Sequence, residues 1–130
     1  MTRSELRENL FKLLFRAEFN APEEMADQKK YFFEEVPLKD SERDELRTKA
    51  DNILKNLEKI DESLNDKVTG WKTDRLGKVE LTILRLAVYE ILYDDAVPTS
   101  VAINEAVELA KKFGQDSSSA FVNGVLAKFS

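Results

Sequence analysis

The segment spanning residues 79–93 constrains the fold more than any other part of the chain. Its apolar side chains fall on nearly every side of a helix, and they include Val79, Leu81, Ile83, Leu84, Leu86, Ala87, Val88, Ile91 and Leu92. A helix that is apolar all round is buried, because water would otherwise contact its apolar faces. The sequence therefore predicts a central helix that other helices surround.

The remaining segments supply such neighbours, because their apolar residues recur with the 3.6-residue period of a helix. Only four glycines and three prolines interrupt the pattern. We expect a first helix over residues 4–19, with Phe11, Phe15 and Phe19 in its apolar stripe, a second helix opened by Pro22, and a third beginning at Asp40-Ser41. A short helical turn should follow over residues 73–78. After the central helix we expect one helix capped by Thr99 or Ser100 and ended by Gly114, and a last helix capped by Asp116-Ser117. The pattern predicts an all-α fold of about seven helices in a single domain, residues 1–130.

The third segment carries a regular apolar seam. Leu46, Ala50, Ile53, Leu57, Ile60 and Leu64 recur at alternating spacings of four and three residues. Such a seam faces another helix. A coiled coil has the same spacing, but this repeat is short, which favours a helix of a bundle.

The composition excludes several classes of function. The chain has no cysteine and no histidine, so thiolate chemistry and the commonest metal ligand and general base are absent. The formal net charge of −5 excludes a uniformly basic nucleic-acid binder but allows a local basic patch. Neither a signal-peptide pattern nor a long apolar run is present, so we expect a cytoplasmic protein without a membrane span.

The sequence gives little support for a catalytic site. The acidic pairs Glu34-Glu35 and Asp94-Asp95 are typical of solvated helix ends, and the serines at 117–119 are typical of a helix cap and first turn. No glycine-rich phosphate loop is present. We therefore expect a binding protein that is not an enzyme and has no metal or cofactor.

Polar side chains at two places need partners. In the first helix, Arg3 and Arg7 share one side, and Lys12 and Arg16 lie roughly opposite, which by itself is typical of a solvated face. Arg85 is embedded in apolar sequence, so we expect it to pair with a carboxylate.

Several motifs in the second half resemble one known family. They are Trp71 with Arg75, residues 83–90 (ILRLAVYE), Val97-Pro98 leading into residues 101–114 (VAINEAVELAKKFG), and residues 121–126 (FVNGVL). Their order and spacing closely resemble the NusB family of bacterial transcription antitermination factors. Leu6-Arg7-Glu8 with Phe11 and Phe15 is similar to the opening of that family.

The resemblance implies a seven-helix fold in two helical subdomains. It also implies binding of single-stranded boxA-type RNA from ribosomal-RNA leaders, jointly with the small-subunit ribosomal protein NusE, within an antitermination complex on RNA polymerase. Carried over by position, it assigns Arg3, Arg7, Phe15, Ser117, Phe121 and Asn123 to RNA binding, and Leu76, Lys78 and Glu80 to the protein-partner surface.

Two alternatives remain from the sequence. The same kind of domain serves as an accessory module for protein–protein interaction or for an RNA methyltransferase, without RNA binding of its own. The oligomeric state is also open between a monomer and a homodimer.

Overall fold

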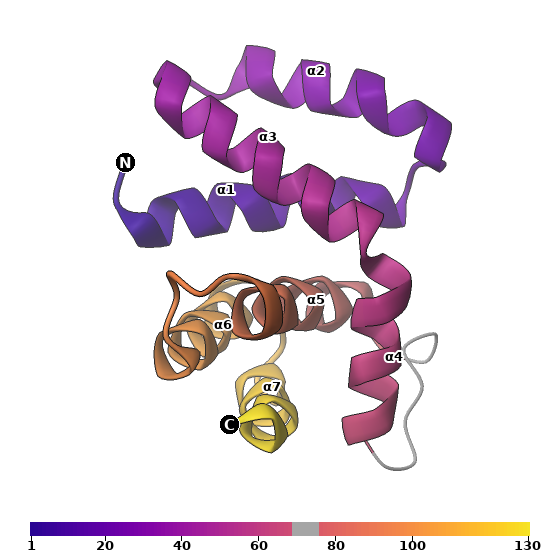
Figure 1. Cartoon of the computed structure of the whole chain (residues 1–130), viewed down its shortest axis with the longest axis vertical. Helices are drawn as coiled ribbons and strands as arrows, with labels where there is room; N and C mark the ends of the chain where they lie inside the picture. The colour runs from indigo at the N-terminus through magenta and orange to yellow at the C-terminus, as the bar shows by residue number, and fades with distance from the viewer. Residues whose placement is uncertain (69–75) are drawn as a thin grey trace. The chain divides into compact units, whose positions relative to one another are not determined.

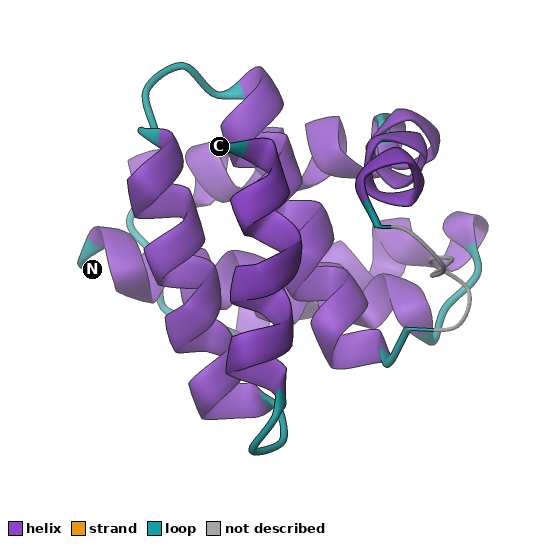
Figure 2. Ribbon diagram, turned by 90° about the horizontal axis from the view of Figure 1, so that it is seen from below, coloured by secondary structure: helices purple, strands orange, loops and turns teal. Residues whose placement is uncertain are grey.

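The chain is all-helical. The computed structural model describes residues 1–68 and 76–130, and these residues form seven α-helices and no strand (Figure 2). They divide into two compact units, Met1–Leu54 and Lys55–Ser130. The predicted all-α fold with two helical subdomains is confirmed. The first half of the helical turn expected over residues 73–78 lies outside the described residues, and in its second half Leu76 and Gly77 are not helical.

The first unit is built from three helices. They are α1 (Arg3–Phe15), α2 (Met25–Glu35) and α3 (Asp40–Lys55), with two short 3-10 helices, η1 (Arg16–Glu18) and η2 (Pro22–Glu24), between α1 and α2 (Figure 1). A capping box starts α1, because the Thr2 hydroxyl accepts from the Glu5 amide and the Glu5 carboxylate accepts from the Thr2 amide. The buried apolar residues of this unit are Leu6, Leu10, Phe11, Leu13, Leu14, Met25, Phe32, Phe33, Leu46, Ala50 and Ile53.

The first helix is shorter than the sequence predicted. It ends at Phe15, and Phe19, expected in its apolar stripe, has 62% of its surface exposed. The side-chain amide of Asn20 donates to the backbone oxygen of Arg16 at 2.8 Å. This local bond satisfies a carbonyl at the end of the helix, so the chain leaves the helical path.

The third predicted segment consists of two helices. Asn56, with φ −105° and ψ 14°, separates α3 from α4 (Leu57–Lys67). Asparagine has a low helix propensity, since its side chain competes with helical hydrogen bonding. The apolar seam itself is confirmed on both sides of the break, because Ile53, Ile60 and Leu64 are at most 1% exposed.

The second unit is organised around one buried helix. It contains α4, α5 (Lys78–Tyr93), α6 (Thr99–Phe113), α7 (Ser118–Leu126) and the 3-10 helix η4 (Ala127–Phe129). Helices α4, α6 and α7 all pack against α5, which confirms the predicted central helix. Its last turn differs from the prediction, because Leu92 is 46% exposed. Among the described helices, none combines the length and the apolar character needed to cross a bilayer.

The side-chain caps predicted for α6 and α7 are wrong. Pro98 occupies the N-cap of α6, and neither it nor Ser117, the N-cap of α7, makes a side-chain capping bond. Proline holds φ near the helical value, here −60°, so α6 starts directly after it. At α7, the Ser118 hydroxyl instead accepts from the Gln115 amide at 2.9 Å.

One ion pair links α4 to α5. The Arg85 guanidinium donates to both carboxylate oxygens of Asp61, at 2.9 Å from Nε and 2.7 Å from the terminal nitrogen. The two side chains are only 17% and 22% exposed. The prediction that Arg85 pairs with a carboxylate is confirmed, and the two-bond geometry fixes the position of α4 along α5.

We predict that Asp61→Asn destabilises the protein by about 1–3 kcal/mol, because a half-buried guanidinium loses its charged partner. Urea unfolding with an unchanged m-value measures this loss. The matched control is Asp66→Asn, on the exposed side of α4, which should change stability by less than about 0.5 kcal/mol. Equal effects of the two substitutions would contradict the role of the ion pair.

Candidate functional site

One row of side chains runs along α1. Arg3, Arg7, Phe11 and Phe15 are spaced four residues apart, so they form a single ridge on the helix surface. We call these four residues the α1 ridge. The two arginines occupy its start, and the two phenylalanine rings stack at its end with centroids 5.8 Å apart. The structure therefore brings Arg3, Arg7 and Phe15, all predicted to bind RNA, into one row.

The aromatic end of the ridge continues to Phe19. This ring meets the edge of Phe15 at 5.1 Å between centroids. Exposure rises along the row, from 3% at Phe11 to 62% at Phe19. An exposed ring beside a half-buried one is chemically suited to stacking against unpaired bases. The sequence reasoning missed Phe19 as a candidate, although it continues the spacing of Phe11 and Phe15.

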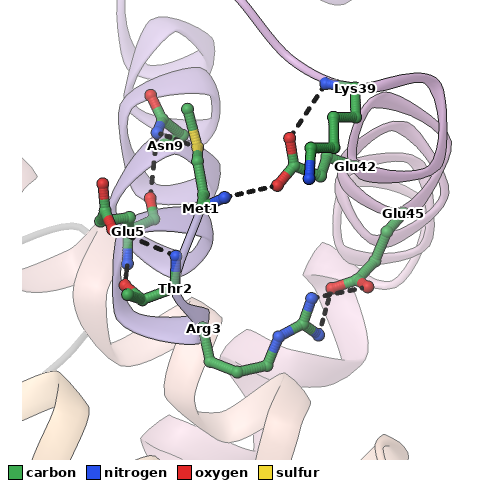
Figure 3. A network of polar contacts seen from close by, with 8 residues as sticks. All are labelled: Met1, Thr2, Arg3, Glu5, Asn9, Lys39, Glu42 and Glu45. Atoms are coloured by element: carbon green, nitrogen blue, oxygen red, sulfur yellow. Dashed lines mark hydrogen bonds and ion pairs between the residues drawn. The ribbon is translucent and has the colours of Figure 1, made fainter.

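The Arg3 side chain is held by an acidic partner. Its guanidinium makes two parallel bonds to the Glu45 carboxylate on α3, at 2.8 and 3.0 Å (Figure 3). One turn earlier on α3, the Glu42 carboxylate accepts from the Met1 ammonium at 2.8 Å. Arg7 is half-buried. Sequence reasoning missed Glu45, because its partner lies 42 residues away.

The ion pair shifts the pKa values of both partners. The hydrogen bond from Arg3 is the main cause that lowers the pKa of Glu45, with burial opposing it and Lys49 adding to it. The same bond raises the pKa of Arg3. At neutral pH both groups are charged, so Glu45 occupies two of the five N–H donors of Arg3 and competes with any other anion for them.

We predict that the Arg3–Glu45 pair breaks only below the ordinary glutamate pKa of 4.5. Since the folded-state pKa is the lower one, the pair stabilises fully above 4.5 and loses its effect as pH falls through the lowered value. A carboxyl NMR titration should give Glu45 a midpoint below 4.5, and Arg3→Gln should move it back up. A wild-type midpoint at 4.5 or higher would rule out this account.

A pocket of about 450 Å³ lies in the second unit, where the loop before α5 meets the start of α7. We call it the α5–α7 pocket. Four predicted site residues line it, together with Gly77, Gln115 and Ser118: they are Leu76, Glu80, Ser117 and Phe121. The family resemblance assigns two of the four to the protein-partner surface and two to RNA binding. The structure therefore joins parts of both predicted surfaces at one place.

The wall of this pocket is held by Ser118, which sequence reasoning had treated only as part of a helix cap. Its hydroxyl donates to the Glu80 carboxylate and accepts from the Gln115 amide, and its side chain is only 2% exposed. Gly114 makes this packing possible. A Cβ on Gly114 would lie 2.6 Å from the Ser118 hydroxyl and 2.7 Å from the Ala110 carbonyl oxygen.

We predict that Gly114→Ala destabilises the protein by about 1–3 kcal/mol, since the added methyl group overlaps Ser118 and the α6 backbone. The control is Gly124→Ala on α7, where an added Cβ meets nothing within 4 Å. That change should be neutral or stabilising by up to about 1 kcal/mol. Thermal unfolding of both variants measures the difference, and equal melting temperatures would refute the close packing.

Two of the predicted site residues in the second unit, Asn123 and Lys78, do not line the pocket. Asn123 is exposed on α7, and the helical spacing places it nearly opposite Phe121. Lys78 is the exposed first residue of α5, and it does not line the pocket. Trp71 and Arg75, two motif residues, lie outside the described residues.

Comparisons with known proteins agree with these features. The model of the NusB family matches residues 4–130. A protein of Agathobacter rectalis, transcription antitermination protein NusB, is 53% identical over 130 residues, covering 99% of this chain and 99% of the relative. The solved structure of T. maritima NusB has a TM-score of 0.87 at 32% identity, covering 99% of this chain and 90% of that one. A structure of antitermination factors NusB and NusE in complex with dsRNA has a TM-score of 0.81 at 26% identity, covering 99% and 97%.

The all-helical fold, the α1 ridge and the α5–α7 pocket are features of a small helical binding module. Within that class, the chain belongs to the NusB family. The match extends over nearly the whole chain, including residues 20–65, which by motif alone resemble the family only in their helical pattern. The resemblance drawn from the motifs is confirmed.

Proposed function

We propose that this protein is a transcription antitermination factor that binds boxA-type leader RNA together with the ribosomal protein NusE. It then helps to assemble the antitermination complex on RNA polymerase in ribosomal-RNA operons. Its family membership and its similarity to a NusB–NusE–RNA structure support this function. The protein acts by binding in the cytoplasm, without a catalytic step, and residues 1–130 act as one functional domain.

The α1 ridge is the proposed RNA contact in the first unit. Arg3 and Arg7 supply positive charge for phosphates, and the rings of Phe15 and Phe19 supply faces for unpaired bases. Ser117, Phe121 and Asn123 add the predicted contacts of the second unit. The ridge is the observation that carries the proposal, because it places cations and aromatic rings in one row.

The α5–α7 pocket is the proposed contact with NusE. Leu76 and Phe121 offer apolar surface, and Glu80 offers a charge that Ser118 holds in place. Lys78 is the first residue of α5, the helix that carries Glu80. Because Ser117 and Phe121 line this pocket too, RNA and NusE would meet here, which favours joint binding over independent binding.

We predict that Arg3→Glu with Arg7→Glu abolishes RNA binding while NusE binding and helical content persist. Fluorescence anisotropy of labelled boxA-type RNA, with and without NusE at two salt concentrations, measures this. Lys59→Glu with Lys67→Glu, two exposed lysines of the second unit, is the control with the same charge change.

A second variant tests the part played by Glu45. Glu45→Gln leaves Arg3 without its acidic partner, so RNA affinity should rise by about two- to fivefold. If RNA binding survives the double arginine reversal, the proposed ridge is wrong. If folded wild-type protein binds NusE but no RNA, the accessory-module alternative replaces the RNA function. Sedimentation of the free protein distinguishes the monomer from the homodimer.

A further inference from the structure

A second pocket, of about 670 Å³, lies between α2 and α3 in the first unit. We call it the α2–α3 groove. Its charged lining residues are Lys29, Lys30, Arg43 and Arg47, with Glu34 and Asp51. Four positive charges face two negative ones, so the lining carries a surplus of two positive charges in a protein whose net charge is −5. None of the proposed RNA or NusE contacts uses this groove.

Ion pairing inside the groove does not reduce this surplus of positive charge. The Lys29 ammonium pairs with the Asp51 carboxylate, which removes one charge of each sign. Arg47 approaches Asp44 only at 3.9 Å, between side chains that are 51% and 75% exposed. A pair this long and this exposed contributes little. Among the described residues, no hydrogen bond or ion pair is found for the Lys30 ammonium.

The two arginines are placed to bind an anion. Arg43 and Arg47 are four residues apart on α3, so both project from the same side of the helix. The central carbon of the Arg47 guanidinium lies over the Phe33 ring, 5.1 Å from its centroid, and this contact restrains the side chain. The Nε of Arg43 is buried without a hydrogen-bond partner, and its guanidinium makes no ion pair with any described residue. The buried Nε is out of reach of a ligand, so an anion would bind the terminal nitrogens, for which no hydrogen bond or ion pair is found among the described residues.

The groove is separate from the α1 ridge. Glu42 and Glu45, which bind Met1 and Arg3, lie on one flank of the buried stripe of α3, while Arg43 and Arg47 lie on the other flank. An anion held in the groove therefore does not compete with the Arg3–Glu45 pair.

From these observations we propose that the α2–α3 groove binds a phosphate monoester. A phosphate monoester carries nearly two negative charges at neutral pH and presents three strong acceptor oxygens. It matches the surplus charge and the fork-shaped donors of two arginines, whereas a single carboxylate would neutralise half of that charge. The volume suits a ligand as large as a mononucleotide. The source is either a free nucleotide or phosphate, or the 5′-phosphate end of an RNA.

The test uses the full chain alone, without NusE or boxA-type RNA, so it is independent of the proposed function. Nitrogen-15 NMR titrations with inorganic phosphate, adenosine 5′-monophosphate and adenosine follow the amide signals of α2 and α3. Phosphate and the nucleotide should shift the signals around Lys29, Arg43 and Arg47, and adenosine should not. Short RNAs with a 5′-phosphate and with a 5′-hydroxyl then distinguish a free ligand from an RNA end.

Charge variants give effects of opposite sign. Arg43→Gln with Arg47→Gln should weaken phosphate affinity by about tenfold or more. Lys30→Gln should weaken it by a smaller factor and serves as a variant on an exposed residue that does not disturb folding. Glu34→Gln should strengthen binding by about two- to threefold, since it removes a repelling charge. Lys59→Gln with Lys67→Gln should leave binding unchanged.

Three outcomes would overturn the proposal. The first is that neither phosphate nor the nucleotide shifts the groove signals. The second is that binding survives unchanged in folded Arg43→Gln with Arg47→Gln protein and in Lys30→Gln protein. The third is that 5′-hydroxyl RNA or an acidic peptide binds the groove as tightly as the phosphorylated ligands, which would identify a backbone or protein contact instead.

Discussion

The second unit depends on the burial of α5. From Leu81 to Glu90 every residue of α5 except Arg85 is buried, and α4, α6 and α7 pack against it. Burial also determines which partner the charged residue in the middle of α5 requires. Arg85 lies among apolar neighbours and needs a carboxylate at a defined position, which Asp61 supplies from α4. One constraint thus determines both the number of neighbouring helices and the placement of one of them.

The sequence predicted the helices well and their ends less well. The apolar character of α5 and the seam through Ile53 and Ile60 are properties of composition and spacing, so they are visible without a structure. The end of α1 and the break at Asn56 depend on single side chains that compete with helical hydrogen bonds. Periodicity does not register such competition, and for this reason the expected helices ran too long.

The candidate site was predictable in its parts but not in its contacts. The spacing of Arg3, Arg7 and Phe15 on one helix follows from the sequence. Glu45 and Ser118 do not, because their partners lie 42 and 38 residues away along the chain. The α2–α3 groove was hidden as well, because its lining comes from two helices that only the fold brings together. An acidic protein can still offer a site for anions, because α3 carries Glu42 and Glu45 on one flank of its buried stripe and Arg43 and Arg47 on the other.

The Arg3–Glu45 pair also affects how RNA affinity would respond to salt. Binding to a nucleic acid is salt-dependent because cations condensed on the phosphates are released. Glu45 acts as a built-in counterion of Arg3. When a phosphate takes its place, the freed carboxylate attracts a cation from solution, and this uptake offsets part of the release. The protein would then make more phosphate contacts than its salt dependence suggests, and its RNA affinity would vary less with the ionic conditions of the cell.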